Sequence, residues 1–352
     1  MNDPRPKTSA FAKATADKQD PGPASAFIDG LMRVKRAPAL VIGVWLATVF
    51  TALPFAIVLQ ALIGDHLGAS MAAQNAADGV DFDWWNEFLA QTSGVGLSFV
   101  PAILGFAAVM RNLSTFVDNS GFPLVIAIAV SAHMLVSLFL LGGVLDRLAR
   151  DRAVGAAAFF SACGTYAVRF LRLAVIATAV YGVLLGPYHH WLFEDLYGAL
   201  TENLTVERTA FFYRVALYIA FLVPLSLANV IVDYAKVRAV VEDRRSMIGA
   251  VVSAVRFIRR NPGAAFGLYL LDTLLFLAVI GLYFLTAPGA GVNNSLAFAI
   301  GQLYIVFRVI VRLQFAASQM ALFQGRLAHA GYVARPVPRW PDSPAAEAIG
   351  PG

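Results

Sequence analysis

Six long apolar stretches, separated by shorter polar segments, dominate the hydrophobic pattern of this chain. A transmembrane helix needs roughly 17–25 mostly apolar residues to cross the hydrocarbon core of a bilayer. All the stretches approach or reach that length, and the third is short unless its helix starts earlier. The pattern predicts an all-α polytopic membrane protein with six transmembrane helices, over residues 39–63, 123–145, 170–185, 211–232, 264–286 and 295–315.

The composition supports a membrane domain rather than a soluble one. Hydrophobic residues make up 59% of the 352 residues and charged residues only 14%, whereas about a quarter of an ordinary soluble domain is charged. The six stretches leave no segment for a second globular core. We therefore expect one membrane domain over residues 26–331, an insertion at 64–121, and disordered tails at 1–25 and 332–352.

Lysine and arginine alternate between the two sides of these spans. Residues 1–37, 146–172, 233–262 and the tail after 315 hold seven, five, seven and three of them, whereas residues 64–121, 188–210 and 287–294 hold only Arg111 and Arg208. Because positive charge near a helix end resists translocation, both termini are predicted to be cytoplasmic and the 64–121 insertion extracytoplasmic. We expect a multi-pass protein of the bacterial inner (plasma) membrane.

The basic clusters indicate a partner. Arg33, Lys35 and Arg36 precede the first span, and Arg256, Arg259 and Arg260 precede the fifth. Charges at these places are expected to lie against anionic lipid headgroups, each contributing about 1 kcal/mol. The expected partner is therefore a bilayer with anionic headgroups at the cytoplasmic face, and a protein partner is left open. The net charge of +5 reflects the alternation of basic residues, and no nucleic acid is expected.

Three segments share one layout, at residues 26–36, 158–172 and 246–260. Each combines an apolar helical face with basic residues and runs into a span, a pattern typical of a helix lying in the membrane interface. Lys35–Pro38 and Arg259–Pro262 also match in form, with a proline near the start of the following helix. The two interpretations are a parallel three-fold repeat of a helix followed by a hairpin, or a coincidence of amphipathic patterns.

The 64–121 insertion contains a further apolar run from Val95 to Met110. If this run were a seventh span, every later loop would change sides and the arginine-rich loops would face outward. The charge pattern instead favours an interfacial or re-entrant helix, broken at Pro101, with Trp84 and Trp85 at headgroup level.

Two charged residues fall inside spans at a similar predicted depth. Asp272 lies about eight residues into the fifth span and Arg308 about thirteen into the sixth, so both would lie roughly 18–20 Å from the outer surface. A charge at that depth is costly unless paired, which makes the two natural partners. The pair would be either a structural ion pair or a gate or ion-coupling site. Arg312, His133 and Gln302 would extend a polar path beside it.

Chemistry-bearing motifs are scarce elsewhere. His190 and Glu194 are four residues apart and would share a helical face, but closure by four ligands is not visible, so they are weak metal candidates beside an ordinary aromatic belt. No phosphate loop, His-Glu-x-x-His or Gly-x-Ser-x-Gly motif occurs in the sequence. Cys163 is the single cysteine and excludes an intramolecular disulfide. We expect no metal and no cofactor, and no recognisable motif supports enzymatic activity.

Three strings carry a resemblance to a known layout: Gly142–Arg147, Asp233–Arg238 and Glu242–Ser246. They resemble uncharacterised bacterial six-helix inner-membrane proteins, which are similar in layout to the membrane domain attached to glycerophosphodiester phosphodiesterases. The resemblance covers about residues 26–330. It implies the six-helix fold, but because no soluble phosphodiesterase domain accompanies it, it implies no catalytic residues.

These observations lead to three functional hypotheses. The first is a non-catalytic membrane scaffold or accessory protein that acts at the inner leaflet through its basic helices. The second is a transporter or channel-like protein for a small solute or lipid, which would use Asp272 and Arg308. The third is a membrane hydrolase built on the cluster at residues 189–195. A water-accessible cavity at Asp272 and Arg308 would favour transport, and a dry packed site would favour a scaffold.

Overall fold

The computed structural model describes residues 22–68, 70–78, 81–100, 105–121, 123–289 and 292–327. Every regular element in these ranges is a helix, as predicted. The elements are α2 (Pro23–Lys35), α3 (Pro38–Leu67), α4 (Ala72–Asp78), α5 (Phe82–Gln91), η1 (Gly94–Ser98), α6 (Gly105–Val117), α7 (Leu124–Arg150), α8 (Ala156–Val183), η3 (Leu184–Tyr188), η4 (Trp191–Leu196), α9 (Tyr197–Thr201), α10 (Glu207–Val241), α11 (Met247–Arg260), α12 (Pro262–Thr286) and α13 (Asn294–Arg326).

Six of these helices are long and apolar enough to cross a bilayer: α3, α7, the continuous run from α8 to α9, α10, α12 and α13. In the most apolar window of each, between 0% and 28% of the residues are buried within the protein. Such apolar surface needs a lipid environment. The prediction of an all-α, multi-pass membrane protein is therefore confirmed.

Two of the three predicted interfacial helices are separate elements. α2 and α11 each end just before a proline, and the residues preceding those prolines share one non-helical conformation: φ −126°, ψ 52° at Ala37 and φ −134°, ψ 50° at Asn261. Proline disfavours the α conformation in the residue before it, so each chain turns there and a new helix begins at Pro38 or Pro262.

The prediction for the second unit is wrong. Residues 158–172 belong to α8, which runs without a break from Ala156 into the third span. That segment contains no proline, so nothing interrupts the backbone hydrogen bonds. Because α8 begins at Ala156 and not at residue 170, the third span is long enough to cross a bilayer. The second unit thus differs from the other two.

The apolar run at 95–110 is not one helix. η1 ends at Ser98 and α6 begins at Gly105, while residues 101–104, including Pro101, lie outside the described ranges. α6 has 13 residues, too few to cross a bilayer. The tails at 1–21 and 328–352 also lie outside the described ranges, and residues 23–25, predicted to be disordered, form the first turn of α2.

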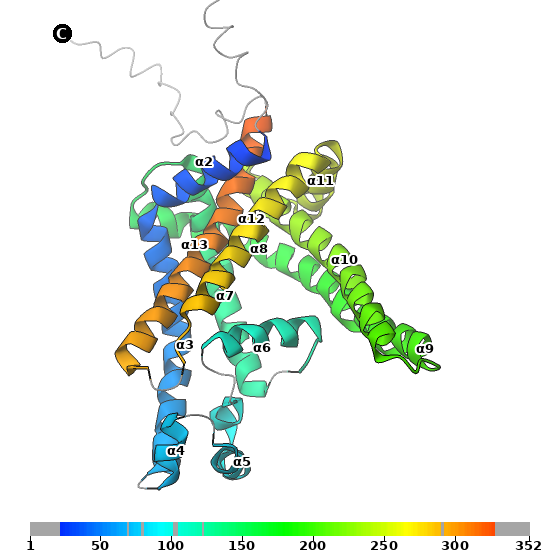
Figure 1. Ribbon diagram of the computed structural model, residues 1–352. Helices are drawn as coiled ribbons and strands as arrows, with labels where there is room; N and C mark the ends of the chain where they lie inside the picture. Colours follow the sequence, from blue (N-terminus) through cyan, green and yellow to red (C-terminus); the bar gives the residue numbers. More distant parts are fainter. Residues whose placement is uncertain are drawn as a thin grey trace, which may run out of the picture.

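The helices meet at one end of the molecule (Figure 1). α2 and α11 lie there, whereas α4 and α5 lie at the opposite end and α8 and α10 diverge as an arm that carries α9 at its tip. We call the α2 and α11 end the arginine-rich end. α13 packs there against α2, α3, α7, α10 and α12, and most of its residues from Val311 to Gln324 are buried.

A glycine permits the closest of these approaches. α2 crosses α13 at Gly30, where a Cβ would lie 2.7 Å from the backbone nitrogen of Ser318 and 2.8 Å from its Cα. Backbone atoms cannot yield to such a contact, so only glycine allows α2 to lie this close to α13. The side chain of Gln314, one turn away on α13, donates to the Phe27 carbonyl of α2 at 2.9 Å. This crossing fixes α2 on the bundle.

Candidate functional site on the arginine-rich end

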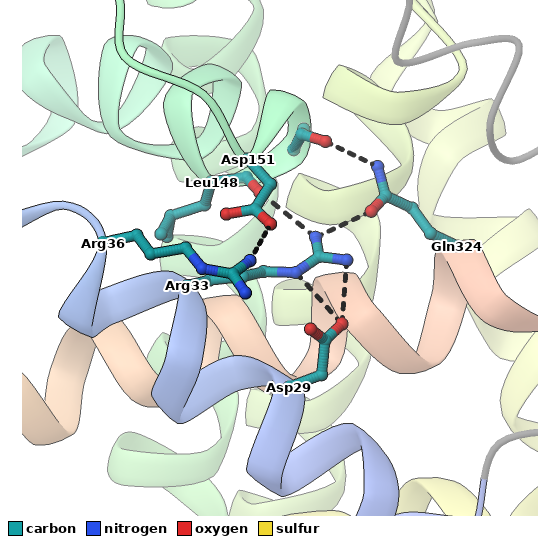
Figure 2. A network of polar contacts seen from close by, with 7 residues as sticks. Asp29, Arg33, Arg36, Leu148, Asp151 and Gln324 are labelled. Carbon is teal, nitrogen blue, oxygen red and sulfur yellow. Dashed lines mark hydrogen bonds and ion pairs between the residues drawn. The ribbon is translucent and has the colours of Figure 1, made fainter.

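Arg33 on α2 is the centre of a polar network that joins three helices (Figure 2). The residue is only 9% exposed. Its Nη1 donates to the Leu148 carbonyl at 3.1 Å and to Gln324 Oε1 at 2.7 Å, while Nε and Nη2 donate to Asp29 Oδ2 at 3.2 and 3.0 Å. The guanidinium is thus buried with partners on α2, α7 and α13.

The network satisfies the end of α7. A helix leaves its last four carbonyls without intrahelical N–H partners, and α7 ends at Arg150. Arg33 donates to the carbonyl of Leu148, and Gln324 Nε2 donates to the carbonyl of Ala149 at 3.0 Å. Side chains from α2 and α13 therefore cap α7.

A second contact between the same elements lies nearer the surface. Arg36 Nη1 lies 2.7 Å from Asp151 Oδ2, just beyond the end of α7 (Figure 2). Arg147 Nη2 in turn donates to the Arg36 carbonyl at 2.9 Å. The turn between α2 and α3 is therefore held from both sides by the end of α7.

A pocket of about 390 Å³ lies beside this network, between the ends of α10, α11 and α13. We call it the arginine pocket. It is lined by five arginines, two other polar residues and three apolar ones: Arg238, Arg244, Arg256, Arg260, Arg326, Ser253, Asn261, Phe257, Phe323 and Leu327.

Glu242, just past the end of α10, orders two of these arginines. It accepts from Arg238 Nη2 at 2.6 Å and Nε at 3.2 Å, and it also pairs with Arg244. Arg238 Nη1 donates to the Ser253 carbonyl of α11 at 2.5 Å, and its guanidinium lies 5.2 Å from the centre of the Phe323 ring. Burial raises the pKa of Glu242, but the hydrogen bonds from Arg238 and Arg244 outweigh burial, so its pKa lies below the ordinary value.

The helix ends explain part of this positive charge. α10, α11 and α13 all end here, and the partial negative charge of a helix C-terminus favours basic residues in its last turn. Arg326 also donates to Asn261 Oδ1, tying α13 to the start of α12. Arg256 and Arg260 are different: both are exposed, and neither makes an ion pair with any residue in the described ranges.

Asp272 and Arg308 do not form the ion pair expected from the sequence. Asp272 is fully buried, and its Oδ2 accepts from Ser318 Oγ at 2.6 Å, while Oδ1 has no hydrogen-bond partner among the described residues. Arg308 is exposed, and its guanidinium lies 5.8 Å from the centre of the Tyr304 ring. Asp272 faces the seam with α13 near α2, away from Arg308.

The register of α12 and α13 explains why Asp272 and Arg308 are not neighbours. α13 continues to Arg326, well past the predicted span end at residue 315, and Arg326 bonds to Asn261 at the start of α12. In this antiparallel register Asp272 lies opposite residue 315. Arg308 is then about two turns, or about 10 Å of helical rise, farther along.

The other residues of the predicted polar path make separate contacts between helices. A ring nitrogen of His133, Nδ1, lies 3.0 Å from Thr51 Oγ1, which joins α7 to α3. Gln302 Oε1 accepts from Trp45 Nε1 at 3.1 Å, which joins α13 to α3. Arg312 is exposed. A common path through these residues stays a prediction.

His190 and Glu194 do lie together, with Nδ1 and Oε2 3.1 Å apart and side chains 58% and 70% exposed. His189 instead places Nε2 3.0 Å from the Val117 carbonyl. In the part of the chain that the structure describes, no three histidine, cysteine, aspartate or glutamate residues are grouped closely enough to hold a metal ion. Two exposed groups do not make a four-ligand site.

Comparison with models of known protein families, with curated proteins and with solved structures finds no match for this chain.

Sequence reasoning missed the polar residues of α13 that organise this end. Four buried polar side chains lie beyond or at the predicted end of the sixth span: Gln314, Ser318, Gln319 and Gln324. The signal was a run of uncharged polar residues within an otherwise apolar helix. Such residues mark a helix that continues into a protein core.

Replacing Arg33 with methionine is expected to lower the free energy of unfolding by about 2–4 kcal/mol. The change leaves the Leu148 carbonyl and Gln324 Oε1 buried without their donor, and an orphaned buried polar group costs about 1–3 kcal/mol. Lys35→Met is the matched control, because it removes the same charge from an exposed site on α2 and should cost no more than about 0.5 kcal/mol. Unfolding in detergent measures both, and equal effects would contradict the role given to Arg33.

The stabilising effect of Glu242 is expected to depend on pH. Its folded pKa is lower than its unfolded pKa of about 4.3, so its contribution is complete above the unfolded pKa and is lost as pH falls through the folded pKa. Glu242→Gln should therefore lower the thermal midpoint at neutral pH, and the gap to the native chain should shrink on acidification. A gap that stays constant down to acidic pH would show that Glu242 is not ionised in the folded protein.

Proposed function

We propose that the protein is a non-catalytic membrane scaffold or accessory protein that acts at the cytoplasmic leaflet of the bacterial inner membrane. The observation that carries the proposal is the two-sided surface of α11. One face is buried in the bundle, whereas Ile248 and Val252 on the other are 70% and 53% exposed, beside the exposed Arg256 and Arg259. A helix that exposes both apolar and basic side chains suits the boundary between headgroups and acyl chains.

α2 has the same character at the same end of the molecule. Ile28 and Met32 are 53% and 49% exposed, and Lys35 and Arg36 are also exposed. The lysine and arginine bias supports a cytoplasmic position for this end. Two such helices there form a basic surface that anionic headgroups or a partner's acidic surface would fit. The likeness in layout to the membrane domain of glycerophosphodiester phosphodiesterases is consistent with this proposal and stays a prediction.

A transporter or channel-like protein is the alternative, and one observation favours it. Asp272 is a buried carboxyl group with no ion pair among the described residues, and such groups in membrane spans are commonly functional. A transport path, however, needs water or solute at that group. Asp272 has no exposed surface and is packed against Ser318, which suits a structural role. The scaffold is therefore the better supported of the two.

The preference for anionic lipid tests the proposed function. The full chain is reconstituted in bilayers containing either spin-labelled phosphatidylglycerol or spin-labelled phosphatidylcholine, and electron paramagnetic resonance measures how much of each is immobilised by the protein. We expect the native chain to select phosphatidylglycerol, and we expect this selectivity to fall as salt is added. The variants Lys35→Gln, Arg36→Gln and Arg259→Gln should each reduce the selectivity by about 1 kcal/mol.

Arg208→Gln is the control, because this exposed arginine lies at the opposite end of α10. It should leave the selectivity at low salt unchanged. Equal immobilisation of the two lipids by the native chain would refute the proposed function.

A further inference from the structure

The arginine pocket gathers positive charge. Five arginine side chains line it, and among the described residues Glu242 pairs with two of them, Arg238 and Arg244, while Arg256 and Arg260 have no carboxylate partner. Asp243, the next acidic residue, is directed elsewhere and pairs with Arg169 at 2.5 Å. Capping of helix ends offsets part of the remaining charge. A surplus held in a concave site is the electrostatic pattern that concentrates anions.

The arginines that line the pocket are held in place differently. Arg238 is fixed by Glu242, by the Ser253 carbonyl and by the ring of Phe323. Arg256 and Arg260 stand four residues apart on α11, so they share one helical face, and in the described ranges neither is engaged by a carboxylate. The lining thus combines a pre-ordered guanidinium, that of Arg238, with two guanidinium groups that have no carboxylate partner among the described residues.

The chemistry of the lining selects among anions. A guanidinium presents its N–H donors as a planar fork that matches the oxygens of a phosphate, and phosphate offers enough oxygens for several forks at once. Ser253 and Asn261 add short polar groups, while Phe257, Phe323 and Leu327 provide an apolar side. A carboxylate has only two oxygens and would leave most of these donors unused.

We propose that the arginine pocket is a saturable binding site for a phosphate group, with Arg256 and Arg260 as the arginines that the ligand engages. The proposal deepens and rests on the proposed function, since an anionic leaflet supplies phosphate groups at this end of the molecule. The phosphate belongs either to a lipid headgroup or to a soluble phosphate ester, and the two sources share the same recognition chemistry.

The experiment uses the full chain in nanodiscs of phosphatidylcholine. One arm titrates inorganic phosphate into this sample by calorimetry, with acetate at matched ionic strength as the comparison anion. The second arm adds phosphatidate to the nanodiscs and counts by native mass spectrometry the phosphatidate molecules that remain bound. We expect one saturable site in at least one arm, and no site for acetate.

The variants locate the site. Arg256→Gln and Arg260→Gln should each weaken binding about tenfold, the loss expected for one strong charge-assisted hydrogen bond. Arg245→Gln is the matched control, because it removes an exposed arginine that precedes α11 and does not line the pocket. All three sites are exposed, and the thermal midpoint of each variant verifies that it folds.

Each outcome decides the proposal. Binding of phosphatidate alone identifies a lipid headgroup, and binding of inorganic phosphate identifies a soluble ligand. Either result supports the proposal if Arg245→Gln retains the binding and the pocket variants lose it. No saturable binding to the native chain in either arm, or equal losses in all three variants, overturns it. The proposed function can fail separately from this proposal. In that case the protein shows no selectivity for phosphatidylglycerol, although inorganic phosphate still binds the pocket.

Discussion

The buried guanidinium of Arg33 is the constraint on which the arginine-rich end depends. Removing such a charge from water costs several kcal/mol unless its donors find partners, and here the partners come from α2, α7 and α13. The same hydrogen bonds satisfy the carbonyls that α7 leaves open at its end. One side chain therefore fixes the position of α2 and completes a membrane-spanning helix. Gly30 makes this possible by letting α2 approach the backbone of α13.

The arginines at this end fall into two groups with different physical roles. Arg33 and Arg238 are largely buried, and their donors are used within the protein. Arg256 and Arg260 are exposed on α11 and have no carboxylate partner among the described residues. The first group holds the helices together, and the proposed phosphate site falls on the second. The excess of arginine at this end of the molecule would then serve both folding and recognition.

Much of the architecture followed from the sequence. The six spans could be read from the apolar stretches, because burying a helix in lipid requires a long apolar run. The breaks after α2 and α11 could be anticipated from Pro38 and Pro262, because proline acts locally. The continuity of α8 was not predicted, because the amphipathic pattern of residues 158–172 resembles that of the other two segments. Unlike those segments, it is not followed by a proline that would end the helix.

The polar core was harder to foresee. Depth along a helix does not give the direction in which a side chain points, so placing Asp272 and Arg308 at one level did not make them neighbours. The true register depends on how far α13 extends, and its buried residues Gln314, Ser318 and Gln324 extend it into the arginine-rich end. Those contacts join residues far apart in sequence, such as Arg33 and Gln324, and no local pattern predicts them. The arginine pocket likewise forms only when three helix ends meet.

The central claim is that the arginine-rich end faces the cytoplasm, and thiol labelling tests it most directly. The native Cys163 is fully buried and should not react, so cysteines introduced at the exposed Lys35 and at the exposed Glu87, near the opposite end, report their own side. A membrane-impermeant maleimide should label Lys35→Cys only in inside-out vesicles and Glu87→Cys only in intact cells. Labelling of Lys35→Cys in intact cells would contradict the orientation, and with it the assignment of both basic helices to the inner leaflet.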